Sequence, residues 1–230
     1  MNLEHLIELD HQWTLALNGS DSLFWDNLMY TYTNTFSWSL VLLTLLIILF
    51  KNNTTRQAFI IILTIALLIA VADRLCSGLV KPLVARWRPT QDPQLMYMVD
   101  VVRGYRGGLY GLFSGHACNT MCIAVFLSWL FRYRNVTLTL LLWSLSTTYT
   151  RIYLGVHHLG DIFVGFIIGA ILGTLFYFLM ERLSKKWEVN KLISSRFTPT
   201  GYIVNDMNIL LTVIFLNYIL VTVFAVSMSL

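Results

Sequence analysis

The chain has 230 residues, of which 57% are hydrophobic and only 12% are charged. Soluble domains are about 45–50% apolar and about 25% charged, so this composition excludes a soluble globular protein and indicates an integral membrane protein. The net charge of +4 does not predict a nucleic-acid partner, because the basic residues lie at membrane borders rather than along one stripe. No repeat, low-complexity tract or linker divides the sequence, so we expect one domain over residues 1–230.

Residues 1–34 precede the first predicted membrane span. Apolar residues at helical spacing predict a short helix in this segment, either lying in the membrane interface or packed on the bundle. They are Leu3, Leu6, Ile7, Trp13 and Leu17. The start MNLEHLIELD has acidic residues where a signal peptide has positive charge, so we expect no cleaved signal peptide.

Six apolar stretches approach the roughly 20 residues that cross a bilayer. They lie at Thr35–Phe50, Gln57–Val80, Leu112–Phe131, Val136–Leu154, Ile162–Met180 and Met207–Ser229. The predicted fold class is therefore all-α: a polytopic bundle of six transmembrane helices over residues 35–230. The fourth stretch carries Arg151 close to its end, so this residue needs a specific role.

The basic residues divide between the two sides that these spans define. Nine of the 16 follow the first, third and fifth spans: Lys51, Arg56, Arg132, Arg134, Arg182, Lys185, Lys186, Lys191 and Arg196. The positive-inside rule identifies this side as cytoplasmic. The other seven lie at or near the opposite side: Arg74, Lys81, Arg86, Arg88, Arg103, Arg106 and Arg151. Cations on the face where the rule expects few indicate a local function for their charge.

The end of the second span carries the sequence KPLVARWRP at residues 81–89. Its cations are the ammonium group of Lys81 and the planar guanidinium groups of Arg86 and Arg88, which are suited to binding phosphate oxygens. Simple anchoring at the membrane interface is the alternative. The topology weakens this alternative, because it brings the cluster to the same membrane face as two further polar clusters. The glycine-rich outer segment Lys81–Gly111 is the longest connection between spans, and loops of this length are often functional.

The sequence SGH at residues 114–116 opens the third span. Ser114 is in position to cap the helix, whose free backbone N–H groups and positive dipole end attract anions. Gly115 has no side chain that would keep a ligand away from those groups, and His116 projects from the same turn. A capped helix with an interfacial histidine is the alternative interpretation of this motif taken alone.

The sequence TRIYLGVHHLGD at residues 150–161 precedes the fifth span. His157 and Asp161 are four residues apart, so on a helix they share a face and can form a hydrogen bond. A carboxylate on one ring nitrogen fixes the tautomer and leaves the other nitrogen free to attack an electrophile. Spacing alone does not exclude His158, which is three residues from Asp161. In the alternative interpretation these residues only cap the helix, and Arg151 extends to the interface.

Cys118 and Cys122 are also four residues apart and lie near His116, which raises the alternative of a metal site. No further ligand is evident in the sequence at that depth. We therefore expect both cysteines, like Cys76, to be small core residues, and we expect no metal site.

Together the three clusters resemble the signature of the type 2 phosphatidic acid phosphatases, whose superfamily includes glucose-6-phosphatase, bacterial acid phosphatases and vanadium haloperoxidases. The matching parts, in order and with the family's internal spacing, are Lys81 with Arg88-Pro89, then Ser114-Gly115-His116, then Arg151 with His157 and Asp161. The motifs cover residues 81–161, and the six-span layout extends the likeness over most of the chain. The resemblance implies the same membrane fold, with an active site at one membrane face.

Two positions depart from the family pattern. Phe113 stands where the family usually has proline, and Thr150 stands where it usually has serine. Threonine keeps the hydroxyl group. Phe113 changes the approach to the helix but no reactive group, so we expect it to affect loop geometry rather than activity.

The resemblance implies a role for each matching residue. His157 would be the nucleophile that forms a phosphohistidine, Asp161 would orient it, and His116 would protonate the leaving oxygen. The family pattern selects His157 over His158. The phosphate oxygens would be held by Lys81, Arg88, Ser114, Gly115 and Arg151. No metal or other cofactor is expected, because the cations neutralise the developing charge.

The resemblance therefore predicts a metal-independent phosphohydrolase that acts on a membrane lipid phosphate or diphosphate at the outer membrane face. Candidate substrates are undecaprenyl diphosphate, a lipid A phosphate, phosphatidylglycerol phosphate and phosphatidic acid. The alternative is a non-catalytic lipid-phosphate binder or translocator, which has no need of two histidines and an orienting carboxylate. We expect an integral protein of a bacterial inner membrane with its site facing the periplasm or exterior. Its expected partners are the lipid substrate and the bilayer, with no nucleic acid and no obligate protein partner.

Overall fold

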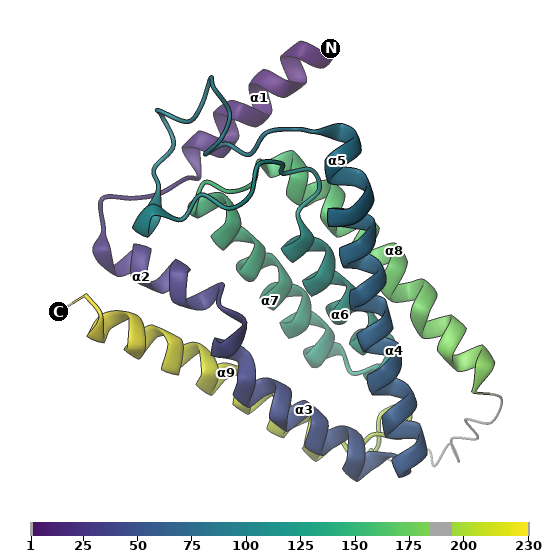
Figure 1. Ribbon diagram of the computed structural model, residues 1–230. Helices are drawn as coiled ribbons and strands as arrows, with labels where there is room; N and C mark the ends of the chain where they lie inside the picture. Colours follow the sequence, from purple (N-terminus) through teal and green to yellow (C-terminus); the bar gives the residue numbers. More distant parts are fainter. Residues whose placement is uncertain (1, 185–194, 230) are drawn as a thin grey trace.

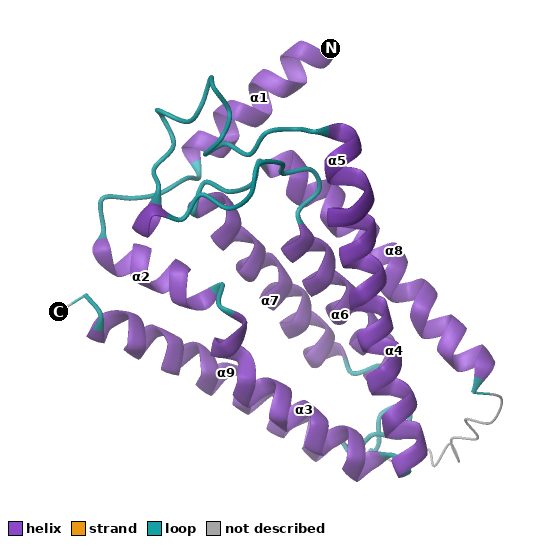
Figure 2. Ribbon diagram, viewed as in Figure 1, coloured by secondary structure: helices purple, strands orange, loops and turns teal. Residues whose placement is uncertain are grey.

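The computed structural model describes residues 2–184 and 195–229 of the chain. Throughout these ranges the regular elements are helices, and the strand-like contacts are two isolated bridges between single residue pairs (Figure 2). The expected all-α fold is therefore confirmed. Of the nine basic residues assigned to the cytoplasmic side, Lys185, Lys186 and Lys191 lie outside the described residues.

The longer helices in chain order are α1 (Leu3–Ala16), α2 (Leu23–Tyr32), α3 (Ser39–Asn52), α4 (Thr55–Asp73), α6 (Gly115–Phe131), α7 (Arg134–Tyr153), α8 (Leu159–Leu183) and α9 (Val204–Ser227). The shorter ones are the 3-10 helices η1 (Thr35–Trp38) and η3 (Val102–Gly104), the π-helix η2 (Arg74–Val80) and the single turn α5 (Lys81–Val84). Helices α4, η2 and α5 continue as one rod (Figure 1).

Six expected spans correspond to helices of the structure. Four segments are long and apolar enough to cross a membrane: Thr35–Asn52, Thr55–Val84, Leu159–Leu183 and Val204–Ser227. Helix α6 is apolar but shorter, with 17 residues. Helix α7 has 20 residues but is more polar, and its polar side chains face the interior, where Ser144, Thr147, Thr148 and Thr150 are buried. The predicted polytopic membrane fold is therefore confirmed.

Helices α6 and α8 lie close together because three glycines of α8 face α6. A Cβ atom on Gly165, Gly169 or Gly173 would lie 2.8, 2.5 or 2.6 Å, respectively, from a carbonyl oxygen of α6 or its N-cap. Small residues at four-residue spacing are typical of closely packed membrane helices. This contact brings the start of α6, which carries His116, next to the start of α8, which carries Asp161 (Figure 1).

The end of the bundle opposite the three polar clusters is closed by hydrogen bonds between connecting segments. Asn53, which follows α3, donates to the Tyr202 hydroxyl before α9 (3.0 Å), and Thr200 donates to the Phe131 carbonyl at the end of α6 (3.1 Å). The α3–α4 and α6–α7 turns and the segment before α9 therefore meet at one end of the molecule (Figure 1). The described basic residues near these turns lie at this end, as their assignment to one side requires.

Helix α1 lies across the start of α8 at the other end of the bundle (Figure 1). The Thr14 side chain is fully buried there, and its Oγ1 accepts a hydrogen bond from the Leu159 backbone N–H (3.1 Å). Leu3 and Trp13 of the same helix are exposed. Packing on the bundle is thus observed for this segment, and its location in the membrane interface stays a prediction.

Candidate active site

The loop between α5 and α6 folds back on itself at the site end of the bundle. The Arg88 backbone N–H donates to the Leu109 carbonyl (3.0 Å), and the Gly111 N–H donates to the Arg86 carbonyl (2.8 Å). A Cβ atom on Gly111 would lie 2.5 Å from Oδ2 of Asp161. Because glycine has no Cβ, this arm of the loop can lie directly against the Asp161 carboxylate.

Lys81 enters the site from the end of the π-helix η2. A π-helical stretch is uncommon and frequently lies at a functional site. This one is tied to the approach to α6, because the Cys76 thiol donates to the Phe113 carbonyl (3.1 Å). The Lys81 ammonium is within electrostatic reach of Arg88 and Asp161. The structure therefore brings the first and third clusters together.

The turn that carries His157 joins α7 to α8. The chain reverses at Gly155, whose φ of +68° lies in the left-handed region that favours glycine. The Thr90 N–H donates to the Gly155 carbonyl (3.2 Å), and the Asn18 amide donates to the Tyr153 carbonyl (2.7 Å). The loop and the N-terminal segment thus both hold this turn in place.

His157 lies between a carboxylate and a guanidinium group. Its Nδ1 is 3.3 Å from Oδ2 of Asp161, and its Nε2 is 3.3 Å from Nη1 of Arg88. Arg88 is fixed by donating to the carbonyl oxygens of Tyr110 (3.1 Å) and Val156 (3.0 Å). With Nδ1–H donated to Asp161, the Nε2 lone pair of a neutral His157 is directed toward the cations of the site.

The protonation state of His157 is set by its surroundings. Burial lowers the pKa of His157 to about 3, and the charge of Arg88 acts in the same direction, although the hydrogen bond to Asp161 opposes both. The ring is therefore neutral at physiological pH. A neutral imidazole is the form that can act as a nucleophile.

The second cluster begins α6 next to these groups. The Ser114 Oγ caps the helix by accepting from the Ala117 N–H (3.4 Å), and the Ser114 N–H donates to the Asp161 carbonyl oxygen (3.0 Å). A Cβ atom on Gly115 would meet only the Cys76 Sγ, at 3.5 Å, so the first turn of the helix is open. His116 is half-buried and within electrostatic reach of the cations Arg151, Arg88 and Lys81.

Arg151 reaches the site through Tyr105 of the loop. Its Nη1 donates to the Thr33 hydroxyl (3.0 Å) and its Nη2 to the Tyr105 hydroxyl (2.9 Å), while its Nε is buried without a hydrogen-bond partner among the described residues. Burial raises the pKa of Tyr105, but Arg151, Arg88 and Lys81 outweigh burial and lower this pKa below its ordinary value. All three cations therefore act electrostatically on the Tyr105 hydroxyl, which Arg151 contacts directly, and spacing in the sequence does not reveal this.

Arg86 forms a second contact to Asp161, and its other partner is Asp10; the sequence analysis missed both pairs. Arg86 donates through Nη1 to Oδ1 of Asp161 (3.0 Å) and through Nη2 to Oδ2 of Asp10 (2.6 Å). The Gly160 N–H donates to Oδ1 of Asp10 (2.8 Å). Asp10 and Arg86 are 76 residues apart, so no local motif links them, and Arg86 was only grouped with the other cations of its cluster.

His158 has different neighbours from His157. Its backbone N–H donates to Oδ2 of Asp161 (3.1 Å), but its Nδ1 is 3.7 Å from that oxygen and its ring stacks on His11 at 5.2 Å between centroids. His157, by contrast, has its Nε2 beside Arg88. The geometry thus favours His157 over His158 as the residue that faces a phosphate.

Comparisons with known proteins agree with this arrangement. Residues 57–185 match the family model of the PAP2 superfamily. The chain is 39% identical over 185 residues to a lipid A 4'-phosphatase of Bacteroides thetaiotaomicron, covering 80% of this chain and 82% of the relative. It is 34% identical over 187 residues to a lipid A 4'-phosphatase of Porphyromonas gingivalis, covering 80% of this chain and 78% of the relative.

A solved structure shares the fold. It is the crystal structure of a transmembrane PAP2 type phosphatidylglycerolphosphate phosphatase from Bacillus subtilis, with a TM-score of 0.58 and 21% sequence identity, covering 80% of this chain and 89% of that chain. The family match spans more than half of the chain and includes all three polar clusters. The resemblance of these clusters and the expected class of enzyme, a lipid phosphatase, are confirmed. The chain belongs to the PAP2 superfamily.

Proposed function

We propose that this lipid phosphatase removes the 4'-phosphate group of lipid A. Two relatives that align with about four fifths of the chain carry that name. A phosphate monoester presents three free oxygens, which suit a pocket bordered by Lys81, Arg88 and Arg151. The substrate proposal narrows the set of lipid phosphates that the sequence predicts to one member.

The observation that carries the catalytic proposal is the setting of the His157 imidazole. Its two nitrogens lie 3.3 Å from Asp161 and 3.3 Å from Arg88, and the side chain is only 2% exposed. Asp161 orients the ring and stabilises the positive charge that the ring acquires when it attacks. Arg88 marks the position of the phosphoryl group, because its guanidinium can hold two phosphate oxygens.

In the proposed first step the Nε2 lone pair of His157 attacks the phosphorus atom. A P–N bond forms while the bond between phosphorus and the sugar oxygen breaks, and His116 gives that oxygen a proton. Lys81, Arg88 and Arg151 neutralise the charge on the equatorial oxygens, and the first turn of α6 at Gly115 adds backbone N–H groups, with the Ser114 hydroxyl beside them. The products of this step are dephosphorylated lipid and phosphohistidine.

In the second step water replaces the lipid oxygen. His116, now neutral, takes a proton from the water, whose oxygen attacks the phosphorus atom. The P–N bond breaks, inorganic phosphate leaves and His157 returns to its neutral form. No metal ion enters either step, because the cations of the chain supply the positive charge.

Phosphate release from defined lipids tests the substrate proposal. Purified protein in detergent is given lipid A that carries only the 4'-phosphate, lipid A that carries only the 1-phosphate, and undecaprenyl diphosphate, phosphatidylglycerol phosphate and phosphatidic acid. We expect kcat/KM for the 4'-phosphate to exceed the others by about tenfold or more, since a tenfold preference needs only about 1.4 kcal/mol of differential binding. Faster release from any other lipid contradicts the substrate, and phosphate binding without release favours the non-catalytic binder.

We propose further that the site faces outward from a bacterial inner membrane. The proposal rests on the positive-inside rule and on the position of the three clusters at the end of the bundle opposite the basic turns (Figure 1). Tyr97 of the outer loop and Asn135 near the α6–α7 turn are both exposed. In a background without Cys76, Cys118 and Cys122, Tyr97→Cys should react with an impermeant maleimide in spheroplasts, and Asn135→Cys only after permeabilisation. The reverse pattern moves the site to the inner leaflet.

A further inference from the structure

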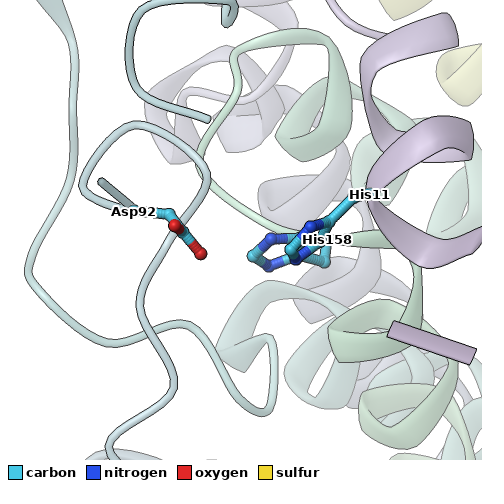
Figure 3. A group of neighbouring side chains, drawn as sticks. All are labelled: His11, Asp92 and His158. Carbon is cyan, nitrogen blue, oxygen red and sulfur yellow. The ribbon is translucent and has the colours of Figure 1, made fainter. Parts of the chain in front are cut away.

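A fourth polar cluster lies beside the phosphate site and has no part in the proposed chemistry. It consists of His11 on α1, Asp92 in the loop after α5 and His158 immediately before α8 (Figure 3). One nitrogen or oxygen atom from each of the three side chains lies within 4.8 Å of the other two. Figure 3 shows the two imidazoles stacked, with the Asp92 carboxylate directed toward them.

The His158 ring is the unexplained part of this cluster. The residue is 0% exposed, and its Nε2 has no hydrogen-bond partner among the described residues. A buried polar atom without a partner destabilises the folded state, and such atoms in folded proteins usually have a partner or a function. The nitrogen of His158 is therefore a place where a ligand would gain binding energy.

We propose that His11, Asp92 and His158 bind a divalent transition-metal ion, for which zinc is the probe. Imidazole nitrogens and a carboxylate oxygen are ligands that zinc prefers, and three protein ligands with one water molecule complete a tetrahedral site. Zinc bonds of about 2.0–2.2 Å place ligand atoms about 3.3 Å apart. The side chains reach this geometry by drawing together by about 1.5 Å or less, which rotations of the His11 and Asp92 side chains supply.

The surroundings of His158 support this assignment. Nδ1 of His158 also has no hydrogen-bond partner among the described residues, and Oδ2 of Asp161 lies 3.7 Å from it. A small movement of the ring would let Nδ1–H donate to this carboxylate while Nε2 binds the metal. A carboxylate behind a ligating histidine is the common arrangement in protein metal sites. The neighbouring cation Arg86 is paired with Asp10 and Asp161, so its charge is balanced by carboxylates.

The ion would connect three elements, α1, the loop that carries Arg88, and the turn that carries His157, and it would add to the contacts that Asp10 and Thr14 of α1 already make there. It lies on the α1 side of Asp161, whereas the Nε2 of His157 faces Arg88. The ion therefore fastens α1 over the catalytic turn without contacting the phosphate pocket. This role is compatible with a reaction whose chemistry uses no metal.

Metal content of purified protein tests the proposal. The affinity tag is removed, because a polyhistidine tag binds zinc. The protein is then stripped with EDTA, dialysed against equimolar zinc and measured by mass spectrometry of the metal. We expect about one zinc ion per chain for the wild type, and at least a tenfold loss of zinc affinity in His11→Ala and in Asp92→Asn. His5→Ala is the matched control, because His5 is an exposed histidine on the same helix, and it should retain the zinc.

The proposal is overturned if the wild type binds no zinc. It is also overturned if the zinc content of His11→Ala and Asp92→Asn equals that of the wild type. Loss of zinc in Cys118→Ser with retention in His11→Ala overturns it as well, since it assigns the ion to the cysteine pair. Size-exclusion profiles show whether each variant is folded.

Thermal unfolding provides a second readout that does not depend on the substrate. Zinc should raise the Tm of the wild type and of His5→Ala, but not that of His11→Ala or Asp92→Asn, because only a site that binds the folded state stabilises it. Turnover on a lipid phosphate, measured well below the Tm, should change less than about twofold with EDTA. A shift of equal size in His11→Ala contradicts the site, and loss of turnover with EDTA contradicts its separation from the chemistry.

Discussion

The two ends of the helix bundle both bury charged side chains, but they pair them differently. At the end away from the site, Asp206 is 1% exposed and accepts hydrogen bonds from Lys51 (2.6 Å) and Asn52 (2.8 Å). At the site end, Arg88 and Arg151 are 9% and 3% exposed, and neither forms an ion pair with a carboxylate of the described residues. One end satisfies its buried charge internally, and the other leaves its buried cations for an anion.

This difference indicates that the buried cations at the site end lower the stability of the fold and are kept for function. Burying a charge without a counter-charge is costly, and removing one partner of a buried pair is costlier than never having the pair. In the proposed mechanism, a bound phosphate dianion would supply the counter-charge that Arg88 and Arg151 lack. The absence of carboxylate partners for Arg88 and Arg151 is therefore a better indicator of the site than the number of charged residues at either end.

The largest expected effect is at the site end, in His157→Ala. Turnover should fall by about 1,000-fold or more, because the nucleophile is lost. Binding of inorganic phosphate should change by less than about tenfold, because Lys81 and Arg88 remain. Release of phosphate from the lipid and the shift in Tm on adding inorganic phosphate measure the two quantities. Asp161→Asn should lose less turnover than His157→Ala, and residual turnover of more than a few per cent in His157→Ala contradicts the nucleophile.

The second-largest effect is expected for Arg88, where one substitution should change catalysis and stability in different ways. Arg88→Met should lower kcat/KM by about 100- to 1,000-fold, the cost of removing one preorganised donor to the developing charge. The same change should leave the Tm equal or higher, because it removes an unpaired buried cation. Arg134→Met is the control, since Arg134 is exposed near the opposite end. A Tm that falls together with kcat/KM in Arg88→Met alone makes Arg88 a structural residue instead.

At the other end of the bundle we expect a smaller effect, on stability and not on turnover. Asp206→Asn removes the carboxylate that Lys51 and Asn52 share. The free energy of unfolding should fall by about 1–3 kcal/mol, as when a buried hydrogen-bonding group loses its partner. The kcat per folded molecule should stay unchanged. Thermal unfolding beside initial rates checks this, and a changed kcat at equal folded fraction would show that the two ends are coupled.

The smallest expected effect concerns pH. Because the pKa of His157 is lowered to about 3, the neutral nucleophile persists until the pH falls through about 3. Phosphoenzyme formation from p-nitrophenyl phosphate needs no acid for its leaving group, so its rate should change by less than twofold between pH 7.5 and 5.5, after correction for substrate ionisation. An ordinary histidine with a pKa near 6.5 would lose about tenfold. That loss, if observed, places His157 in a more hydrated setting.

Below pH 6.5 the same shift acts on stability. The unfolded chain takes up a proton on His157 as the pH falls through about 6.5, whereas the folded protein does not until about pH 3. Folding therefore becomes less favourable as the pH decreases across this window. A Tm that rises on acidification from pH 7 to pH 5 would contradict the buried neutral ring.

What the sequence predicts well is what repeats or lies close along the chain. The apolar stretches predict the membrane helices. The contact expected between His157 and Asp161 is observed at 3.3 Å, but His157 lies in the turn before α8 and not on the shared helix from which the contact was predicted. The spacing of Gly165, Gly169 and Gly173 is equally local, but its importance lies in the close approach of α6, which only the three-dimensional arrangement shows.

What the sequence cannot supply is contact between distant segments. Tyr105 bonds to Arg151 across 46 residues, and Asp10 reaches Arg86 across 76. The apolar spacing near the N-terminus predicts a helix but not which of its polar residues meets Arg86, and the loop that carries Tyr105 has no such spacing. For the same reason the sequence does not predict that His11 and Asp92 lie near His158. The metal site considered from the sequence was at Cys118 and Cys122, which are close along the chain, and not beside α1.

The π-helical stretch Arg74–Val80 determines the direction in which the side chains of the following residues point from the rod. Each residue of an α-helix turns the chain by about 100°, whereas each residue of a π-helix, whose hydrogen bonds span five residues instead of four, turns it by roughly 80°. Relaxing η2 (Arg74–Val80) to an α-helix of the same length would therefore rotate Lys81 by well over about 100° around the rod axis. The rod itself would lose little, because an α-helix has better backbone hydrogen bonds. The direction of the Lys81 ammonium therefore depends on the helix type of the preceding residues, and a change from π-helix to α-helix at Arg74–Val80 would turn this group away from the site.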